Sequence, residues 1–97
     1  MGGKVTLPNG DKFKGNLVNN KKQGQGTYYY KNGAKYEGNF ANDKMEGQGV
    51  LNYADGHKYE GQFKNGKKSG HGIETSIDGF SYEGEWRDDQ KFTKKFV

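Results

Sequence analysis

The 97-residue chain contains no cysteine and one proline, and only 29% of its residues are hydrophobic. Without cysteine, neither a disulfide framework nor a thiolate metal site can hold the chain together. No stretch approaches the roughly eighteen consecutive apolar residues of a membrane-spanning helix, and the N-terminus lacks the apolar run of a secretory signal peptide. These absences predict a soluble, intracellular and cytoplasmic protein.

Glycine and aromatic residues are abundant instead, with 17 glycines and an aromatic content of 14%. A low aliphatic content is typical of disordered chains, but such chains rarely carry this many aromatic rings. The net charge of +4 comes from 16 basic and 12 acidic residues, which describes a mixed surface. That mixture does not indicate nucleic-acid binding.

The sequence repeats itself at a step of 23 residues, without an insertion. Each unit places a large aromatic residue two positions before a glycine and four positions before a second bulky residue. The three columns are Phe13, Tyr36, Tyr59 and Tyr82; Gly15, Gly38, Gly61 and Gly84; and Leu17, Phe40, Phe63 and Trp86. A glycine pair and an Asn-Gly or Asp-Gly dipeptide recur in the same phase. Self-similarity of this kind is the signature of a repeat architecture.

Each unit is typical of a β-hairpin, because large and polar residues alternate in "YEGNF" and a turn dipeptide follows "GQGVLNY". No segment shows a helical period. We therefore predict an all-β fold, an elongated single-layer antiparallel meander of about eight or nine short strands. The whole chain, 1–97, is expected to form a single array: a half repeat at 4–12, full repeats at 13–35, 36–58 and 59–81, and an atypical terminal repeat at 82–97.

The alternation also predicts a register for the strands. Across the first turn of the second unit, the expected pairs are Phe40 with Gly47, Gly38 with Gly49, and Tyr36 with Leu51. Across the Asp-Gly turn they are Tyr53 with Tyr59, Leu51 with Gly61, and Phe63 with Gly49. Equivalent aromatics of successive units then lie two strands, roughly 9.5 Å, apart. That gap is too wide for contact between them, so each ring is expected to lie over glycines of the strand between.

The segments "YEGNFANDKMEGQGVLNYADG" and "YEGQFKNGKKSGHG" strongly resemble the MORN (membrane occupation and recognition nexus) repeat. The resemblance implies a rod or trough of β-hairpins, an aromatic-lined groove, and no catalysis by the repeat itself. Both ends depart from the family pattern. Residues 4–12 match only half of a unit, and Thr93 and Lys95 stand where a glycine pair is expected. In the third unit Glu74 and Ser76 replace the groove residues Leu51 and Tyr53.

The aromatic row has two interpretations, which the sequence leaves open. It is either the core of the sheet alone, or a core that also forms a protein-binding groove. A single-layer sheet should leave part of one face open, which would make full burial impossible and offer an anchor for a partner's amphipathic helix or a second array. The row consists of Tyr36, Phe40, Tyr59, Phe63, Tyr82 and Trp86.

A set of lysines recurs in one turn of each unit and is expected to line one edge of the rod. The members are Lys21, Lys22, Lys44, Lys67, Lys68 and Lys91. They are candidates for contact with anionic lipid headgroups. Solvated turns that blunt an aggregation-prone sheet are favoured instead, because acidic residues such as Asp43 and Asp89 interrupt the edge.

Nothing in the sequence predicts a catalytic, cofactor or metal site. Glu37, Glu60 and Glu83 form an acidic row, but the two-strand spacing is too wide for chelation of one ion. His57 and His71 lack a second His or Cys or a close carboxylate pair. No phosphate-binding loop or nucleophile arrangement stands out, so we expect no enzyme.

The expected function is therefore a non-enzymatic structural or adaptor module that binds a protein along its aromatic groove. MORN arrays occur in ciliary radial-spoke and axonemal proteins and in cytoskeletal scaffolds, so the resemblance favours a cytoskeletal or ciliary (axonemal) assembly. The alternative is a peripheral anionic-lipid or phosphoinositide binder at a membrane surface. Self-association through the terminal segment "KFTKKFV" is a third possibility.

Overall fold

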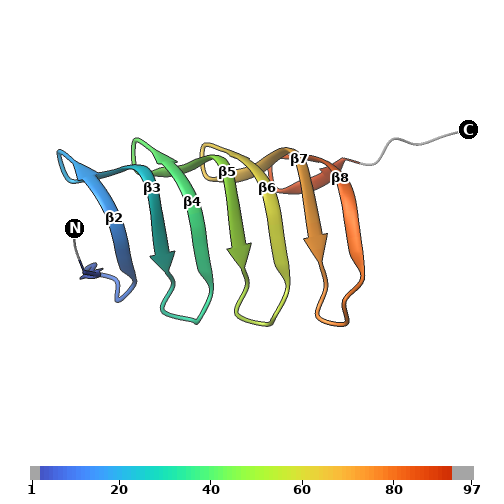
Figure 1. Cartoon of the computed structure of the whole chain (residues 1–97), viewed down its shortest axis with the longest axis horizontal. Helices are drawn as coiled ribbons and strands as arrows, with labels where there is room; N and C mark the ends of the chain where they lie inside the picture. Colours follow the sequence, from blue (N-terminus) through green and yellow to red (C-terminus); the bar gives the residue numbers. More distant parts are fainter. Residues whose placement is uncertain (1–2, 93–97) are drawn as a thin grey trace, which may run out of the picture.

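The computed structural model describes residues 3–92, which form nine strands in one open sheet whose spatial order follows the chain (Figure 1). Every neighbouring pair is antiparallel, and the described residues contain no helix. The predicted all-β meander is confirmed. Residues 93–97, with Thr93, Lys95 and most of the terminal segment, lie outside this description. The strands are β1 (Val5–Thr6), β2 (Lys12–Val18), β3 (Lys21–Tyr29), β4 (Lys35–Ala41), β5 (Lys44–Asn52), β6 (Lys58–Lys64), β7 (Lys67–Thr75), β8 (Ser81–Arg87) and β9 (Gln90–Phe92).

Two kinds of turn alternate along the chain, and each kind lies on its own border of the sheet (Figure 1). The tight turns place two residues at positive φ, for example Asn42 at 51° and Asp43 at 76°. This is the conformation of two-residue hairpin turns, which favours Asn, Asp and Gly. The wider turns carry the Asp-Gly dipeptide. In one of them Tyr53 N donates to His57 O (2.8 Å), and Gly56 adopts a φ of 104°.

The predicted register is correct in part. Gly38 pairs with Gly49 and Tyr36 with Leu51, as expected, but an irregularity between Gly38 and Phe40 brings Phe40 opposite Met45 instead of Gly47. Across the wide turn, the prediction was wrong by two residues. The structure pairs Leu51 with Tyr59, Gly49 with Gly61 and Gly47 with Phe63. The cause is the Asp-Gly turn. Its glycine, Gly56, adopts a left-handed conformation at the last position of a three-residue loop, and this loop sets which residues of the two strands pair.

The corrected register lines up glycines across neighbouring strands. Gly38 of β4 pairs with Gly26 of β3 and with Gly49 of β5. The ring of Tyr36 lies over this floor, because its atoms are the nearest neighbours of a Cβ built at Gly49. The Tyr36 hydroxyl then donates to the backbone O of Asn39 at 2.8 Å. The expectation that rings lie over glycines is confirmed.

The rings also contact one another, in a way that the sequence analysis missed. Tyr36 of one unit meets Phe63 of the next, with ring centroids 5.1 Å apart and planes at 86°. Ring contacts within a unit alternate with ring contacts between neighbouring units. Rings at equivalent positions are too far apart to touch, but the second ring of one unit reaches the first ring of the preceding unit. The result is a continuous ring stack of edge-to-face contacts. Its order is Phe13, Phe40, Tyr36, Phe63, Tyr59, Trp86 and Tyr82.

Candidate binding face

The ring stack defines one face of the sheet, here called the ring face, and it is the core of the molecule. Tyr36 and Tyr59 are 0% exposed, and Phe40, Phe63 and Trp86 are also buried, whereas Tyr82 is partly buried. The expectation that a single-layer sheet cannot bury these rings was wrong. Edge-to-face neighbours and a second set of side chains cover them. The buried rings are therefore not themselves an exposed groove.

The covering set, here called the upper layer, is partly buried and packs against the ring stack. Its members are Leu7, Tyr28, Tyr30, Met45, Leu51 and Tyr53. Leu51 and Tyr53 were predicted as groove residues, whereas the other four were not predicted. The signal was present in the alternation of "GTYYY", which puts Tyr28 and Tyr30 on the same side as Gly26. The surface that a partner can reach is this layer.

Tyr28 is held in the upper layer by a polar contact at its tip. Its hydroxyl donates to Asp11 Oδ2 at 2.6 Å. Burial, together with this bond, raises the pKa of Tyr28 to about 12. The same hydrogen bond and one from Lys31 N lower the pKa of the exposed Asp11 carboxyl. The phenol therefore stays neutral and the carboxyl charged around neutral pH.

The predicted lysine edge divides into two rows that lie one residue apart. Lys21, Lys44 and Lys67 begin strands β3, β5 and β7 and are exposed. The three others contact aromatic rings, so the six lysines lie at one border of the sheet but divide between its two faces. Alternation along a strand explains the division, because neighbouring side chains point to opposite faces. The inward row is Lys22, Lys68 and Lys91, with Met45 in the equivalent position of the second unit.

Lys68 is the most deeply placed of these lysines, at 9% exposure. Its ammonium donates to the Tyr53 hydroxyl and lies 4.8 Å from the Trp86 ring centroid and 5.5 Å from that of Tyr59. Attraction between a cation and ring faces supports such a position. Lys68 thus behaves as part of the ring-face packing.

The tight turns form a contact between successive units. Lys22 N donates to Asp43 Oδ1 at 3.0 Å, and the Lys22 ammonium lies 2.8 Å from the same oxygen. These bonds lower the pKa of the Asp43 carboxyl. Lys68 N donates in the same way to Asp89 Oδ1 at 2.8 Å. In the second unit Met45 stands in the place of Lys22, and Gly66 stands in the place of Asp43. This contact is absent there, because Gly66 has no carboxylate.

Hollows open on the ring face in step with the repeat. The first, about 670 Å³, is lined by Leu7, Phe13, Leu17 and Lys22. The second, about 260 Å³, has Tyr30, Phe40 and Met45 in the places of Leu7, Leu17 and Lys22, and Tyr28 also lines it. Lys68 takes the inner place of the third unit. The last, about 210 Å³, is lined by Glu74, Ser76, Phe80, Ser81, Tyr82 and Lys91. The two hollows that upper-layer side chains line therefore lie in the N-terminal half of the array.

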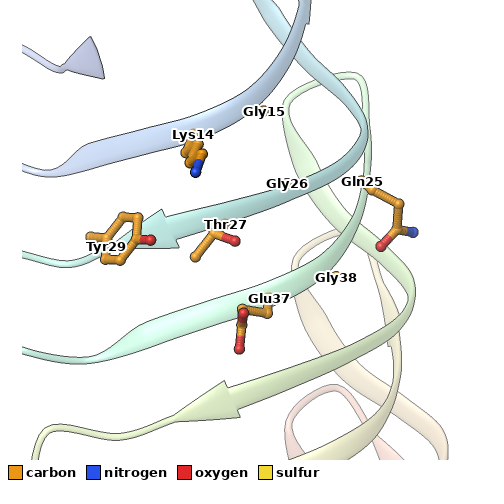
Figure 2. A pocket seen from close by; sticks show the side chains of 8 residues that line it. All are labelled: Lys14, Gly15, Gln25, Gly26, Thr27, Tyr29, Glu37 and Gly38. Carbon is orange, nitrogen blue, oxygen red and sulfur yellow. The ribbon is translucent and has the colours of Figure 1, made fainter. Parts of the chain in front are cut away.

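The opposite face is polar and shallow. Figure 2 shows Lys14, Thr27 and Glu37 side by side on β2, β3 and β4, around an open hollow of about 550 Å³. The acidic row also lies on this face, where Val50 pairs with Glu37 and Glu60 and so separates them. Within residues 3–92, no three His, Cys, Asp or Glu side chains gather closely enough to hold a metal ion.

The two histidines each meet one carboxylate. His57 Nδ1 lies 2.9 Å from Asp55 Oδ1 in a wide turn, and His71 Nε2 lies 3.1 Å from Glu83 Oε2 between β7 and β8. Both pairs are solvent-accessible. They stabilise local structure and form no larger constellation. A search of residues 3–92 for a helix long and apolar enough to cross a membrane also finds none.

This architecture of hairpins at a 23-residue step agrees with the comparison to known families. The sequence profile of the MORN repeat matches residues 13–35, 36–58, 59–80 and 82–91. The chain therefore belongs to the MORN-repeat family, a class of non-enzymatic repeat modules that act in protein or membrane-lipid interaction. Comparison of the chain with curated proteins gave no significant match.

Proposed function

We propose that the chain is a non-enzymatic structural or adaptor module that binds a protein partner along the ring face. The observation that carries this proposal is the upper layer, whose aromatic and aliphatic side chains remain partly exposed above a rigid ring stack. Apolar surface that is presented on one face and is not fully covered is typical of interaction sites. Tyr30 and Tyr53 are suited to this role, since tyrosine is enriched among the residues that dominate binding.

The assembly that we propose is cytoskeletal or ciliary (axonemal), and the corresponding location is the cytoplasm. Support comes from the use of MORN arrays in radial-spoke, axonemal and cytoskeletal scaffold proteins. An elongated body with extents of 51 × 26 × 21 Å suits a scaffold, because it offers one long face to a partner. The buried aromatics Phe40 and Phe63 support this face from below.

Affinity capture from an extract of ciliated cells tests the proposal. The informative variant is Tyr30→Ser with Tyr53→Ser, which removes upper-layer rings and leaves the buried stack unchanged. A matched control is Gln25→Ser with Gln48→Ser at two exposed positions outside the upper layer. We expect cytoskeletal partners to be retained by wild type and control and lost by the tyrosine variant, with thermal melting showing that all three fold. Equal recovery by all three would rule the proposal out.

The lipid alternative now rests on the row that does not contact the rings. Lys22 and Lys68 are packed against rings, and the exposed Lys91 is paired with Glu74 at 3.3 Å, so Lys21, Lys44 and Lys67 remain for headgroup contact. Binding through exposed lysines should weaken as salt rises, because charges separated by more than about 8 Å are screened at physiological ionic strength. Co-sedimentation with anionic vesicles that is lost in salt and in the triple serine variant of this row would favour the lipid function.

A further inference from the structure

The two apolar hollows are one repeat apart and present equivalent positions of successive units. Leu7 and Leu17 line the first, and Tyr30 and Phe40 stand in the same places of the second. The second hollow, at about 260 Å³, is smaller than the roughly 300–1,000 Å³ of small-molecule sites, so it suits a single side chain. In the third unit Lys68 occupies the inner place, bonded to Tyr53. Lys22, its equivalent in the first unit, is paired with Asp43 instead, because Leu7 stands in the place of Tyr53, and the hollow beside it stays open.

Positive charge borders the hollows. Lys44 lines the second hollow, and Lys21 is its equivalent one unit earlier, while the carboxylate of Asp43, which lines both hollows, is paired with Lys22. Both lysines are exposed, and both belong to the row that does not contact the rings. A partner whose apolar side chains enter the hollows therefore meets lysine beside each of them. Carboxylates on the flank of that partner complement this charge.

The spacing of the hollows selects a helical partner. Two strands at about 4.8 Å each separate equivalent positions by roughly 9.6 Å. Seven residues of an α-helix rise about 10.5 Å and return to nearly the same face. In an extended segment, residues three apart span about 10 Å but point to opposite faces. Of the α-helix and the β-strand, only the helix presents two anchors at the required distance on one side.

We propose that the ring face binds an acidic amphipathic helix through two apolar side chains seven residues apart, one in each N-terminal hollow, with carboxylates facing Lys21 and Lys44. This inference rests on the proposed function and names the chemistry of its partner. The third unit is closed to such an anchor by Lys68, so the C-terminal half of the ring face contributes less to binding.

A variant that fills the second hollow can be designed from an arrangement that another unit of the chain already contains. Gly66 has a φ of 83°, close to the 76° of Asp43 and the 71° of Asp89, and nothing lies within 4 Å of a Cβ built there. Met45→Lys with Gly66→Asp therefore copies the third unit, in which Lys68 N donates to Asp89 and the Lys68 ammonium donates to the Tyr53 hydroxyl, because Tyr30 stands in the place of Tyr53. This substitution fills the hollow with a contact that the fold already uses. A control of equal charge is Gln48→Lys with Gln25→Asp, at two exposed positions outside the upper layer.

The probe is a labelled alanine-based peptide of three heptads, with one Leu in each heptad and Glu beside the Leu row. One comparison peptide replaces Glu by Lys, and a second spaces the Leu residues by five. We expect fluorescence anisotropy to show binding of the first peptide only. Met45→Lys/Gly66→Asp should weaken it by about tenfold, a loss of one anchor, while the control variant binds as wild type.

Several outcomes would overturn this inference. They are no binding of the first peptide, equal binding of either comparison peptide, and unchanged binding by a folded Met45→Lys/Gly66→Asp variant. If that variant binds normally while Tyr30→Ser/Tyr53→Ser does not, the acidic two-anchor helix is wrong and the proposed binding face remains. If neither variant changes peptide binding or partner capture, both proposals fail. Circular dichroism and thermal melting establish that each variant folds.

Discussion

The ring of Tyr36 occupies the space into which a side chain at Gly49 would project. The two residues lie on neighbouring strands, β4 and β5, and the nearest atoms to a Cβ at Gly49 all belong to that ring. Tyr59 and Gly72 repeat the relationship one unit later. Glycine in a strand normally weakens it, but here its missing side chain is what allows an aromatic ring to lie flat against the sheet.

Gly49→Ala should destabilise the fold by about 1–3 kcal/mol, the usual cost of forcing an extra methyl group into a packed core. The ring cannot move aside easily, because Phe40 and Phe63 hold it from both sides at 5.1 Å. Urea unfolding measures the change. Gly3→Ala is the control, since nothing lies within 4 Å of a Cβ at that position. Equal stability of the two variants would contradict the packing described here.

Tyr36→Phe and Tyr59→Phe should each cost about 1 kcal/mol, since each leaves one backbone carbonyl without a phenol donor. The two bonds are alike, from Tyr36 to Asn39 O at 2.8 Å and from Tyr59 to Gln62 O at 2.9 Å. Their costs should add in the double variant, because the hydroxyls share no partner. Chemical denaturation of the three variants tests this. A cost at only one position would show that the repeats are not equivalent.

Lys68→Ala should cost about 1–2 kcal/mol, because its buried stem and its contacts with the Tyr53, Tyr59 and Trp86 rings are lost. Lys67→Ala, next to it in the sequence, is expected to stay within about 0.5 kcal/mol of wild type, as exposed substitutions usually do. Thermal melting distinguishes the two. Equal effects would return Lys68 to the solvated edge predicted from the sequence.

Stability should fall in alkaline solution. Burial raises the pKa of Tyr36 and of Tyr59 to about 12, from an ordinary value of 10.0. Since the folded chain favours the neutral phenols, their contribution is fully present below pH 10 and is lost as the pH rises through about 12. Urea midpoints at pH 8 and pH 11 measure the loss. The double variant Tyr36→Phe/Tyr59→Phe should lose less, and an equal loss would argue against buried, neutral phenols.

The sequence was sufficient for the hairpin order, because the 23-residue step and the turn dipeptides are local signals. It also located Gly38 opposite Gly49 correctly. It failed where a single residue changes the geometry. The irregularity beside Phe40 leaves no distinct pattern in the residues, and the Asp55-Gly56 dipeptide marks a turn without fixing how many residues the loop contains.

The candidate site was harder to predict than the fold. Burial of Tyr36 depends on rings from two units, which no single repeat reveals. The division of Lys67 from Lys68 required the register, because the direction of a side chain in a strand changes with every residue. The hollow at Met45 and Gly66 arises from a difference between repeats, and alignment by similarity tends to hide such differences.

The ring stack has a consequence for changes in chain length. In the units that begin at Tyr36 and Tyr59, the two rings of the unit contact each other. The second ring, Phe40 or Phe63, also contacts the first ring of the preceding unit. Removal of residues 36–58 would bring Phe63 against Phe13 in place of Phe40, and every type of ring contact would be restored. Removal of any other length would break the sequence of contacts at one joint. Gain or loss of a whole unit of 23 residues therefore preserves every type of ring contact, and the length of the ring face changes in steps of two strands.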